Sequence, residues 1–150
     1  MAVNFSCQRR VEFCETDAAG IVHFSSLMIY MEQAEHALLR SLGLSVALSA
    51  TSHSIWPDPV LHWPRVRAEC DFLSPARFED NLLCLVSVAR LGSKSVTFRH
   101  LIQSGRTDIA SGSMTSVCCQ RKNAQSDSVG SLIGIEIPAD VREKLNQFLT

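Results

Sequence analysis

The segment from Phe24 to Leu42 constrains the fold of this chain more than any other. Its apolar side chains recur at three- and four-residue steps, as one face of an α-helix requires. They are Phe24, Leu27, Met28, Met31, Ala34, Leu38 and Leu42, widened by Ile29, Tyr30, Ala37 and Leu39. The remaining polar edge is narrow and comprises Glu32, Glu35, His36 and Arg40. We therefore predict a long, largely buried helix that ends before Gly43, and a packed core explains its stripe better than a hydrophobic ligand channel.

Strand-like segments lie on both sides of this helix. Residues 5–13 precede it, and residues 65–72 alternate charged and apolar side chains, which predicts a half-buried strand. Turn signals separate the next three predicted strands, which are residues 82–91, 95–104 and 107–120. The tail, residues 139–149, has the apolar spacing of a short helix.

One apolar helix with about five antiparallel strands predicts an α+β fold, in which the sheet wraps around the helix so that each buries a face against the other. A chain of 150 residues is long enough for one core, and no repeat or linker divides it, so we predict a single domain over residues 1–150. Because such a sheet leaves open edges, we expect a homodimer or homotetramer.

Charge and hydropathy exclude several classes of partner. The 14 basic and 15 acidic side chains leave a net charge of -1, which gives no broad positive field for nucleic acid. No run approaches roughly 18 consecutive apolar residues, and the first residues lack the apolar core of a signal peptide. We therefore expect a cytoplasmic protein with no membrane insertion and no nucleic-acid partner.

Cysteine and histidine usage indicates neither disulfides nor a metal. The six cysteines lack paired C-x-x-C spacing, and no secretory context favours their oxidation, so we expect reduced thiols. The histidines have no metal-site spacing, and the chain lacks the G-x-S-x-G elbow of serine hydrolases. The sequence therefore predicts no metal and no cofactor.

The segment FCETDAAGIVHFSS, residues 13–26, carries the most informative chemistry. It places Asp17 in a tight loop directly before the predicted helix. A helix N-terminus offers unpaired backbone N–H groups and a partial positive charge, which can polarise an arriving carbonyl oxygen. Judged by residue chemistry alone, Asp17 more often accepts a backbone hydrogen bond in such a turn than reacts.

The wider pattern, Glu15 to Val22, resembles the D-x-D-x-x-G-I/V-V motif of the 4-hydroxybenzoyl-CoA thioesterase family, and within it the enzymes that act on aryl-CoA substrates. Shorter similarities continue through nearly the whole chain. The resemblance implies the hot-dog fold and an acyl-CoA substrate, with dihydroxynaphthoyl-CoA and short-chain acyl-CoA hydrolases among its neighbours. It also implies that Asp17 acts on the thioester, either as nucleophile or as base for water.

The resemblance extends to the residues around Asp17. The family usually has an aromatic residue, or tyrosine then histidine, where this chain has His23 and Phe24. The Phe24 backbone N–H can polarise the thioester carbonyl whatever its side chain, and His23 either donates to the same oxygen or remains a loop residue. Gly20 is implied in substrate binding. We expect Glu15 to order the loop and Glu32 to find a partner in the core or at a subunit contact.

Lys94 and Ser95 match the family position near the nucleotide end of CoA, where a lysine and a hydroxyl can contact phosphates. An isolated hairpin lysine is otherwise simply solvated. Relatives carry arginines where Gly92 and Ser93 stand, so other cations could contribute. The candidates are Arg121 and Lys122.

The acyl group stays open at this point. Aromatic and histidine side chains that could shape its pocket, or equally belong to the core or a subunit contact, are Trp56, Trp63, Phe72, Tyr30 and His62. The alternative function is a hot-dog module that binds acyl-CoA or a protein partner without turnover, because fold alone does not establish catalysis.

Overall fold

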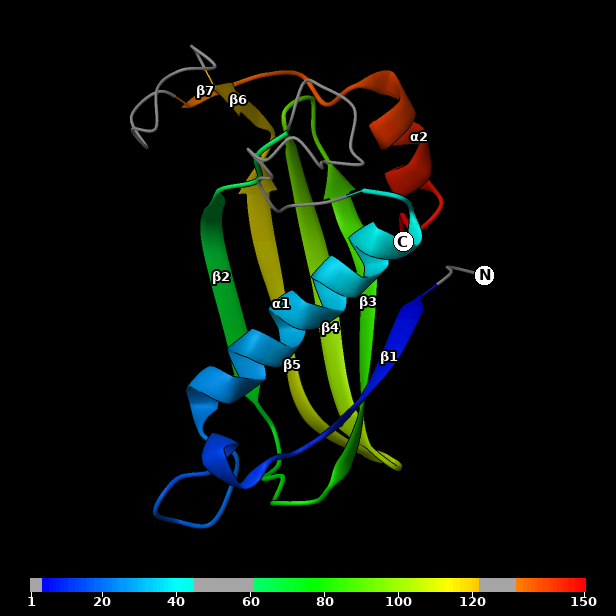
Figure 1. Ribbon diagram of the computed structural model, residues 1–150. Helices are drawn as coiled ribbons and strands as arrows, with labels where there is room; N and C mark the ends of the chain where they lie inside the picture. The colour runs from blue at the N-terminus through cyan, green and yellow to red at the C-terminus, as the bar shows by residue number, and fades with distance from the viewer. Residues whose placement is uncertain (1–3, 45–60, 122–131) are drawn as a thin grey trace.

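The computed structural model describes residues 4–44, 61–121 and 132–150. Figure 1 shows one long helix lying across the face of a curved sheet. The sheet has five strands in the order β1-β3-β4-β5-β2, and each neighbouring pair is antiparallel. The predicted α+β class, with an antiparallel sheet wrapped around a central helix, is confirmed.

The helices and strands follow the predicted ranges closely. Helix α1 is Phe24–Ser41, and Gly43 follows it with φ of 71°, the left-handed conformation that suits glycine. The sheet strands are β1 (Phe5–Arg10), β2 (Arg65–Phe72), β3 (Asn81–Leu91), β4 (Ser95–Ser104) and β5 (Thr107–Val117). A short helix, α2 (Ala139–Asn146), buries Val141 and Leu145.

Two predicted strands are shorter than expected. The first ends at Arg10, and Phe13–Glu15 forms a single 3₁₀ turn, η1, because the Glu15 side chain accepts a hydrogen bond from the Glu12 backbone. The strand predicted over 107–120 breaks at Cys118, whose N–H donates to the Lys94 carbonyl. Beyond this break, β6 (Cys119–Arg121) pairs with β7 (Leu132–Gly134), a strand that the sequence did not predict.

The inner face of the sheet and the sheet-facing side of α1 form the core, as the helical stripe predicted. Tyr30, Met31 and Leu38 are buried there against residues such as Val86 and Phe98. The predicted edges of the stripe are partly wrong, since Glu35 is fully buried while Ile29 and Phe24 are exposed. A guanidinium that neutralises Glu35, described below, explains why that carboxylate can leave water.

Strand β2 differs from its prediction as a half-buried strand. It lies at the edge of the sheet beside β5, and most of its side chains are exposed on both faces. Val66 is 62% exposed and Phe72 is 55% exposed. The protomer therefore leaves apolar side chains and one row of backbone hydrogen-bonding groups uncovered along this edge.

The opposite ends of the sheet are far apart. The connection between β2 and β3 lies at the end where α1 begins, since the Val22 N–H donates to the Ala76 carbonyl. The hairpin between β3 and β4 lies at the other end (Figure 1). With 11 residues in β3, the two ends are roughly 35 Å apart. No helix among the described ranges has the length and hydropathy to cross a membrane.

Candidate active site

The loop before α1 folds as a miniature hairpin. The His23 N–H donates to the Glu15 carbonyl, Thr16 and Val22 form an antiparallel bridge, and the Asp17 N–H donates to the Ile21 carbonyl at 2.9 Å. Backbone hydrogen bonds therefore fix Asp17 in the loop that precedes α1, seven residues before Phe24.

Asp17 itself closes the turn at the tip. Its carbonyl accepts from the Gly20 N–H at 3.0 Å, and its Oδ1 accepts from the Ala19 N–H at 2.8 Å. Gly20 has φ of 75°, which explains the glycine at this position. Asp17 is half-buried, and no described residue donates a hydrogen bond to Oδ2. The carboxylate thus has the turn role that residue chemistry favours, and keeps one oxygen available.

Glu15 anchors this loop to α1 and β1. Its carboxylate pairs with Arg9 and accepts from the Tyr30 hydroxyl at 2.6 Å and the Glu12 N–H at 2.8 Å. The Arg9 guanidinium also stacks 4.6 Å above the Tyr30 ring. Burial pushes the pKa of Glu15 upward, but the hydrogen bonds from Tyr30, Glu12 and Arg9 outweigh it and leave the pKa below its usual value. The expected ordering role of Glu15 agrees with these contacts. The sequence did not predict that Arg9 and Tyr30 would contact Glu15, because they lie on other elements.

His23 is the N-cap of α1. Its Nδ1 accepts from the Ser25 N–H at 3.3 Å and lies 2.7 Å from Ser25 Oγ. A ring that accepts at Nδ1 carries its proton at Nε2 when neutral, which leaves a donor at the helix end. The Phe24 N–H at the first helical position donates to none of the described residues. Two donors are therefore available where α1 begins.

An aromatic rim borders this helix end. Phe24 is 61% exposed, and its ring meets Phe72 of β2 edge to face, with centroids 6.3 Å apart. Leu73, which follows Phe72, is exposed as well. Phe72 therefore contacts the first residue of α1, and of the roles left open for it, this exposed position does not place it in the core. In contrast, Tyr30 points into the core toward Glu15, and Trp56 lies outside the described residues.

The predicted CoA-binding residues are not brought to Asp17 within one protomer. Lys94 and Ser95 lie in the hairpin between β3 and β4, at the opposite end of the sheet. Lys94 is exposed, and its Nζ lies 3.4 Å from the Gly134 carbonyl. A guanidinium that the sequence did not suggest, that of Arg142, donates to the Gly92 carbonyl at 2.7 Å and holds this hairpin against α2. The side chains of the other predicted cations, Arg121 and Lys122, lie outside what the structure describes.

A second polar cluster lies under the other half of α1. Glu35, with 1% of its surface exposed, pairs with Arg65 at 2.7 Å, and Arg65 also donates to Ser116 at 3.2 Å. His100 Nε2 lies 3.8 Å from Glu35. Burial, with Arg65 nearby, lowers the pKa of His100 to about 3, so this ring is neutral at ordinary pH. Glu32 also has a partner, since it meets Arg65 at 3.7 Å, but its side chain is 50% exposed rather than in the core.

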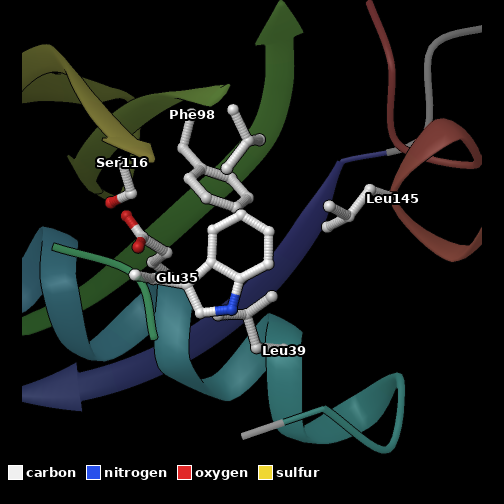
Figure 2. Close-up of a pocket in the computed structure, with 7 residues that line it drawn as sticks. Glu35, Leu39, Phe98, Ser116 and Leu145 are labelled. Atoms are coloured by element: carbon white, nitrogen blue, oxygen red, sulfur yellow. The ribbon is translucent and has the colours of Figure 1, made fainter. Parts of the chain in front are cut away.

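A narrow crevice with no room for a water molecule adjoins this cluster. Figure 2 shows Glu35 beside Ser116 on one side and Leu145 on the other. Aromatic and aliphatic side chains complete the lining, which are Leu39, Trp63, Val96 and Phe98. Trp63 therefore contributes to the core at this end of the protomer, and buried His62 bridges to Cys119.

No group of three or more histidine, cysteine, aspartate or glutamate side chains within the described ranges could hold a metal ion. A half-buried carboxylate beside a helix N-terminus with free donors is an arrangement suited to acyl transfer without metal ligands in the protein. Within the described residues, Oδ2 of Asp17 and the Phe24 N–H are both left without a hydrogen-bond partner.

Comparisons with known proteins agree with this fold. Residues 19–110 match the model of the thioesterase superfamily, a range that begins just after Asp17. A 1,4-dihydroxy-2-naphthoyl-CoA hydrolase from Synechococcus sp. strain CC9311 is 33% identical over 106 residues, 70% of each chain. Its counterpart from strain WH7803 is 30% identical, over 84% of this chain and 89% of that protein.

Among solved structures, a gentisyl-coenzyme A thioesterase superposes with a TM-score of 0.73 at 30% identity. The superposition covers 93% of this chain and 98% of that one. The chain therefore belongs to the thioesterase superfamily and is a thioesterase of the hot-dog fold.

Proposed function

We propose that this protein hydrolyses a CoA thioester to the free acid and CoA, with Asp17 as its catalytic carboxylate. The observation that carries the proposal is the hairpin loop that holds Asp17 in front of α1, whose first N–H, that of Phe24, donates to none of the described residues. The names of its relatives, which are hydrolases of aromatic CoA thioesters, support the substrate class. We also propose a single domain over residues 1–150 and a cytoplasmic location.

In this proposal the helix end binds the thioester carbonyl. The Phe24 N–H and the partial positive charge of the helix polarise the oxygen as it gains negative charge. His23, with its proton on Nε2, is a second donor. The positive φ of Gly20 turns the chain so that the loop tip passes close to the substrate.

Asp17 then acts in one of two ways. As nucleophile, its free oxygen attacks the carbonyl carbon, CoA leaves as a thiolate, and water cleaves the resulting mixed anhydride. As general base, it takes a proton from a water molecule that attacks the same carbon directly. Either route yields the same acid and CoA.

The acyl group is proposed to be aromatic. Phe24 and Phe72 present two exposed rings at the helix end, where a planar acyl group would meet them edge to face. Both gentisyl and dihydroxynaphthoyl groups, named for the relatives, have this shape.

We further propose that the active unit is a dimer formed through β2, or a tetramer built from such dimers. Antiparallel pairing of two β2 strands about Ala68 would satisfy the open edge and set Arg67 opposite Glu69 of the second copy. The two-fold axis that relates the two β2 strands would place the Lys94 hairpin of one copy at the end of the sheet where Asp17 of the other copy lies. This arrangement explains how residues roughly 35 Å apart in one protomer can serve one CoA ester.

The function is tested by assaying free thiol release from a panel of aromatic and aliphatic acyl-CoAs. We expect turnover with at least one aromatic ester and weaker turnover with aliphatic ones. Binding of CoA esters, measured by calorimetry, without any thiol release would instead establish the alternative, a binding module without catalysis.

The composite site has its own test, which mixes two defective variants. In a mixed dimer of Asp17→Asn and Lys94→Ala protomers, one of the two sites combines intact Asp17 with intact Lys94 from the other copy. Turnover in the mixture at low substrate should therefore exceed the mean of the two separate variants. Equality with that mean would contradict a site shared between copies.

A further inference from the structure

Two cysteines that are distant in sequence face each other across neighbouring strands. Cys7 of β1 is the register partner of Cys84 of β3. Both are free thiols. Directly opposed residues in an antiparallel pair have side chains on the same face of the sheet, with Cα atoms about 4.5–5.5 Å apart. Disulfides span Cα separations of about 4.4–6.8 Å, and direct opposition in the ladder places this pair within that range.

The two thiols differ in accessibility. Cys84 is buried in the core on the inner face of β3, whereas Cys7 is half-buried on the edge strand β1. An oxidant can therefore reach Cys7, and the thiol of Cys84 lies beside it, shielded from solvent. The described cysteines include no other pair in register, since Cys70 lies opposite Gly112.

The surroundings of Cys7 favour its reactive form. Interaction with the Cys84 thiol, against the effect of burial and with help from Arg40 and Arg9, lowers the pKa of Cys7 to about 7. The pKa of Cys84 is raised by its Cys7 neighbour and by burial. A thiolate near neutral pH beside a protonated thiol is the arrangement of an attacking and a resolving cysteine.

We propose that Cys7 and Cys84 form a reversible oxidation site that closes to a disulfide in the presence of a hydroperoxide. The Cys7 thiolate attacks the peroxide oxygen and breaks the O–O bond, which gives a sulfenic acid and releases hydroxide from hydrogen peroxide or an alkoxide from an organic hydroperoxide. The Cys84 thiol then attacks the Cys7 sulfur, forming the S–S bond and releasing water. The two thiols together lose two electrons and two protons, and the peroxide is reduced to water or an alcohol.

This bond would tie the edge strand β1 to the centre of the sheet under α1. Because it would close a loop from Cys7 to Cys84, more than half the chain, it should raise Tm by roughly 5–10 °C. The residues proposed for thioester hydrolysis take no part in this oxidation, and its test does not depend on them.

The experiment treats the folded full chain with hydrogen peroxide, blocks the remaining thiols with N-ethylmaleimide, and identifies linked peptides by mass spectrometry. We expect the wild type to lose two alkylatable thiols, to yield a Cys7–Cys84 peptide and to recover both thiols with dithiothreitol. Cys7→Ser should abolish the link. Cys70→Ser, a matched change at another half-buried cysteine without an opposed thiol, should retain it.

Stability provides a second measurement that does not require the buried residue to be replaced. The peroxide-induced rise in Tm should appear in the wild type and in Cys70→Ser and be absent in Cys7→Ser. Irreversible sulfinic or sulfonic acid at Cys7 without the linked peptide would overturn the proposal. A disulfide that joins any other pair would overturn it equally.

Discussion

Asp17 lies in the loop before α1 and Glu35 in the second half of that helix, and the surroundings of the two carboxylates differ in nearly every respect. Asp17 is held by backbone N–H groups and keeps one oxygen available. Glu35 is buried, with its charge opposed by Arg65, and burial raises its pKa despite that partner. Perturbed titration and burial are often taken to mark active sites. Here they mark a carboxylate that is paired inside the core, while the carboxylate that we propose to react is the accessible one in the loop before α1.

The largest expected effect distinguishes these two carboxylates by rate. Asp17→Asn removes the negative charge with little change in volume, so turnover should fall by roughly 10²–10⁴-fold. Glu35→Gln should leave the rate per folded molecule close to that of the wild type. Steady-state thiol release on the best substrate measures both, and circular dichroism checks the fold. A folded Asp17→Asn variant with the wild-type kcat would remove Asp17 from catalysis.

The second effect concerns stability at the Glu35 end. Arg65→Ala leaves the Glu35 carboxylate buried without its main partner, and breaking such a pair costs about 3–5 kcal/mol. Because the Arg65 side chain is 25% exposed, we expect roughly 2–4 kcal/mol, measured by urea unfolding. The double variant Glu35→Met/Arg65→Met should recover most of the loss. If the double variant is no more stable than Arg65→Ala, the unpaired Glu35 charge is not the cause of the stability loss in Arg65→Ala.

The third effect is that the contributions of Glu15 and Glu35 to folding stability change in opposite directions with pH. The pKa of Glu15 is lowered in the fold, so its contribution to stability is present above the unfolded pKa and is lost on acidification. The pKa of Glu35 is raised, so its contribution is present below the unfolded pKa and is lost as pH rises through the folded value.

Thermal unfolding across roughly pH 3–6 measures this difference. Relative to wild type, Glu15→Gln should be most destabilised at the upper end of the range and least at the lower end. Glu35→Gln should show the opposite trend. Parallel profiles for the two variants would contradict the assigned directions.

The smallest effect concerns the hairpin end of the sheet. If Lys94 contacts a CoA phosphate, Lys94→Ala should raise KM by roughly three- to tenfold with little change in kcat, the pattern of uniform binding. Arg99→Ala, an exposed cation elsewhere on β4, is the matched control and should leave KM unchanged. An unchanged KM in Lys94→Ala would exclude Lys94 from the substrate site.

The sequence predicted the fold well because hydrophobic periodicity identifies the residues that share one face of a helix or strand. The helical stripe located α1, and strict alternation located β2, although not its exposure. Alternation shows which residues share a face of a strand, whereas the covering of that face depends on neighbours in space. The same limit explains why the burial of Glu35 was not predicted. The guanidinium that pairs with it belongs to Arg65, which lies 30 positions away in the sequence.

The candidate site was predictable only in its local part. The turn at Asp17 and the glycine at its tip are contiguous in sequence, so a motif could reveal them. The Arg9–Glu15–Tyr30 contacts join three elements and have no sequence signature. Lys94 is the opposite case. A motif match suggested that it shares a substrate site with Asp17, but within a single chain the two residues lie at opposite ends of the sheet.

The miniature hairpin before α1 also makes this loop a place for redesign. Its position depends on main-chain hydrogen bonds from residues such as Asp17, Val22 and His23 rather than on side-chain packing at its tip. Ala18 and Ala19 are exposed there, so libraries varied at these two positions should retain the fold while changing the surface that an acyl group meets. Gly20 should stay fixed, because a side chain at its positive φ would distort the turn that orients the carboxylate.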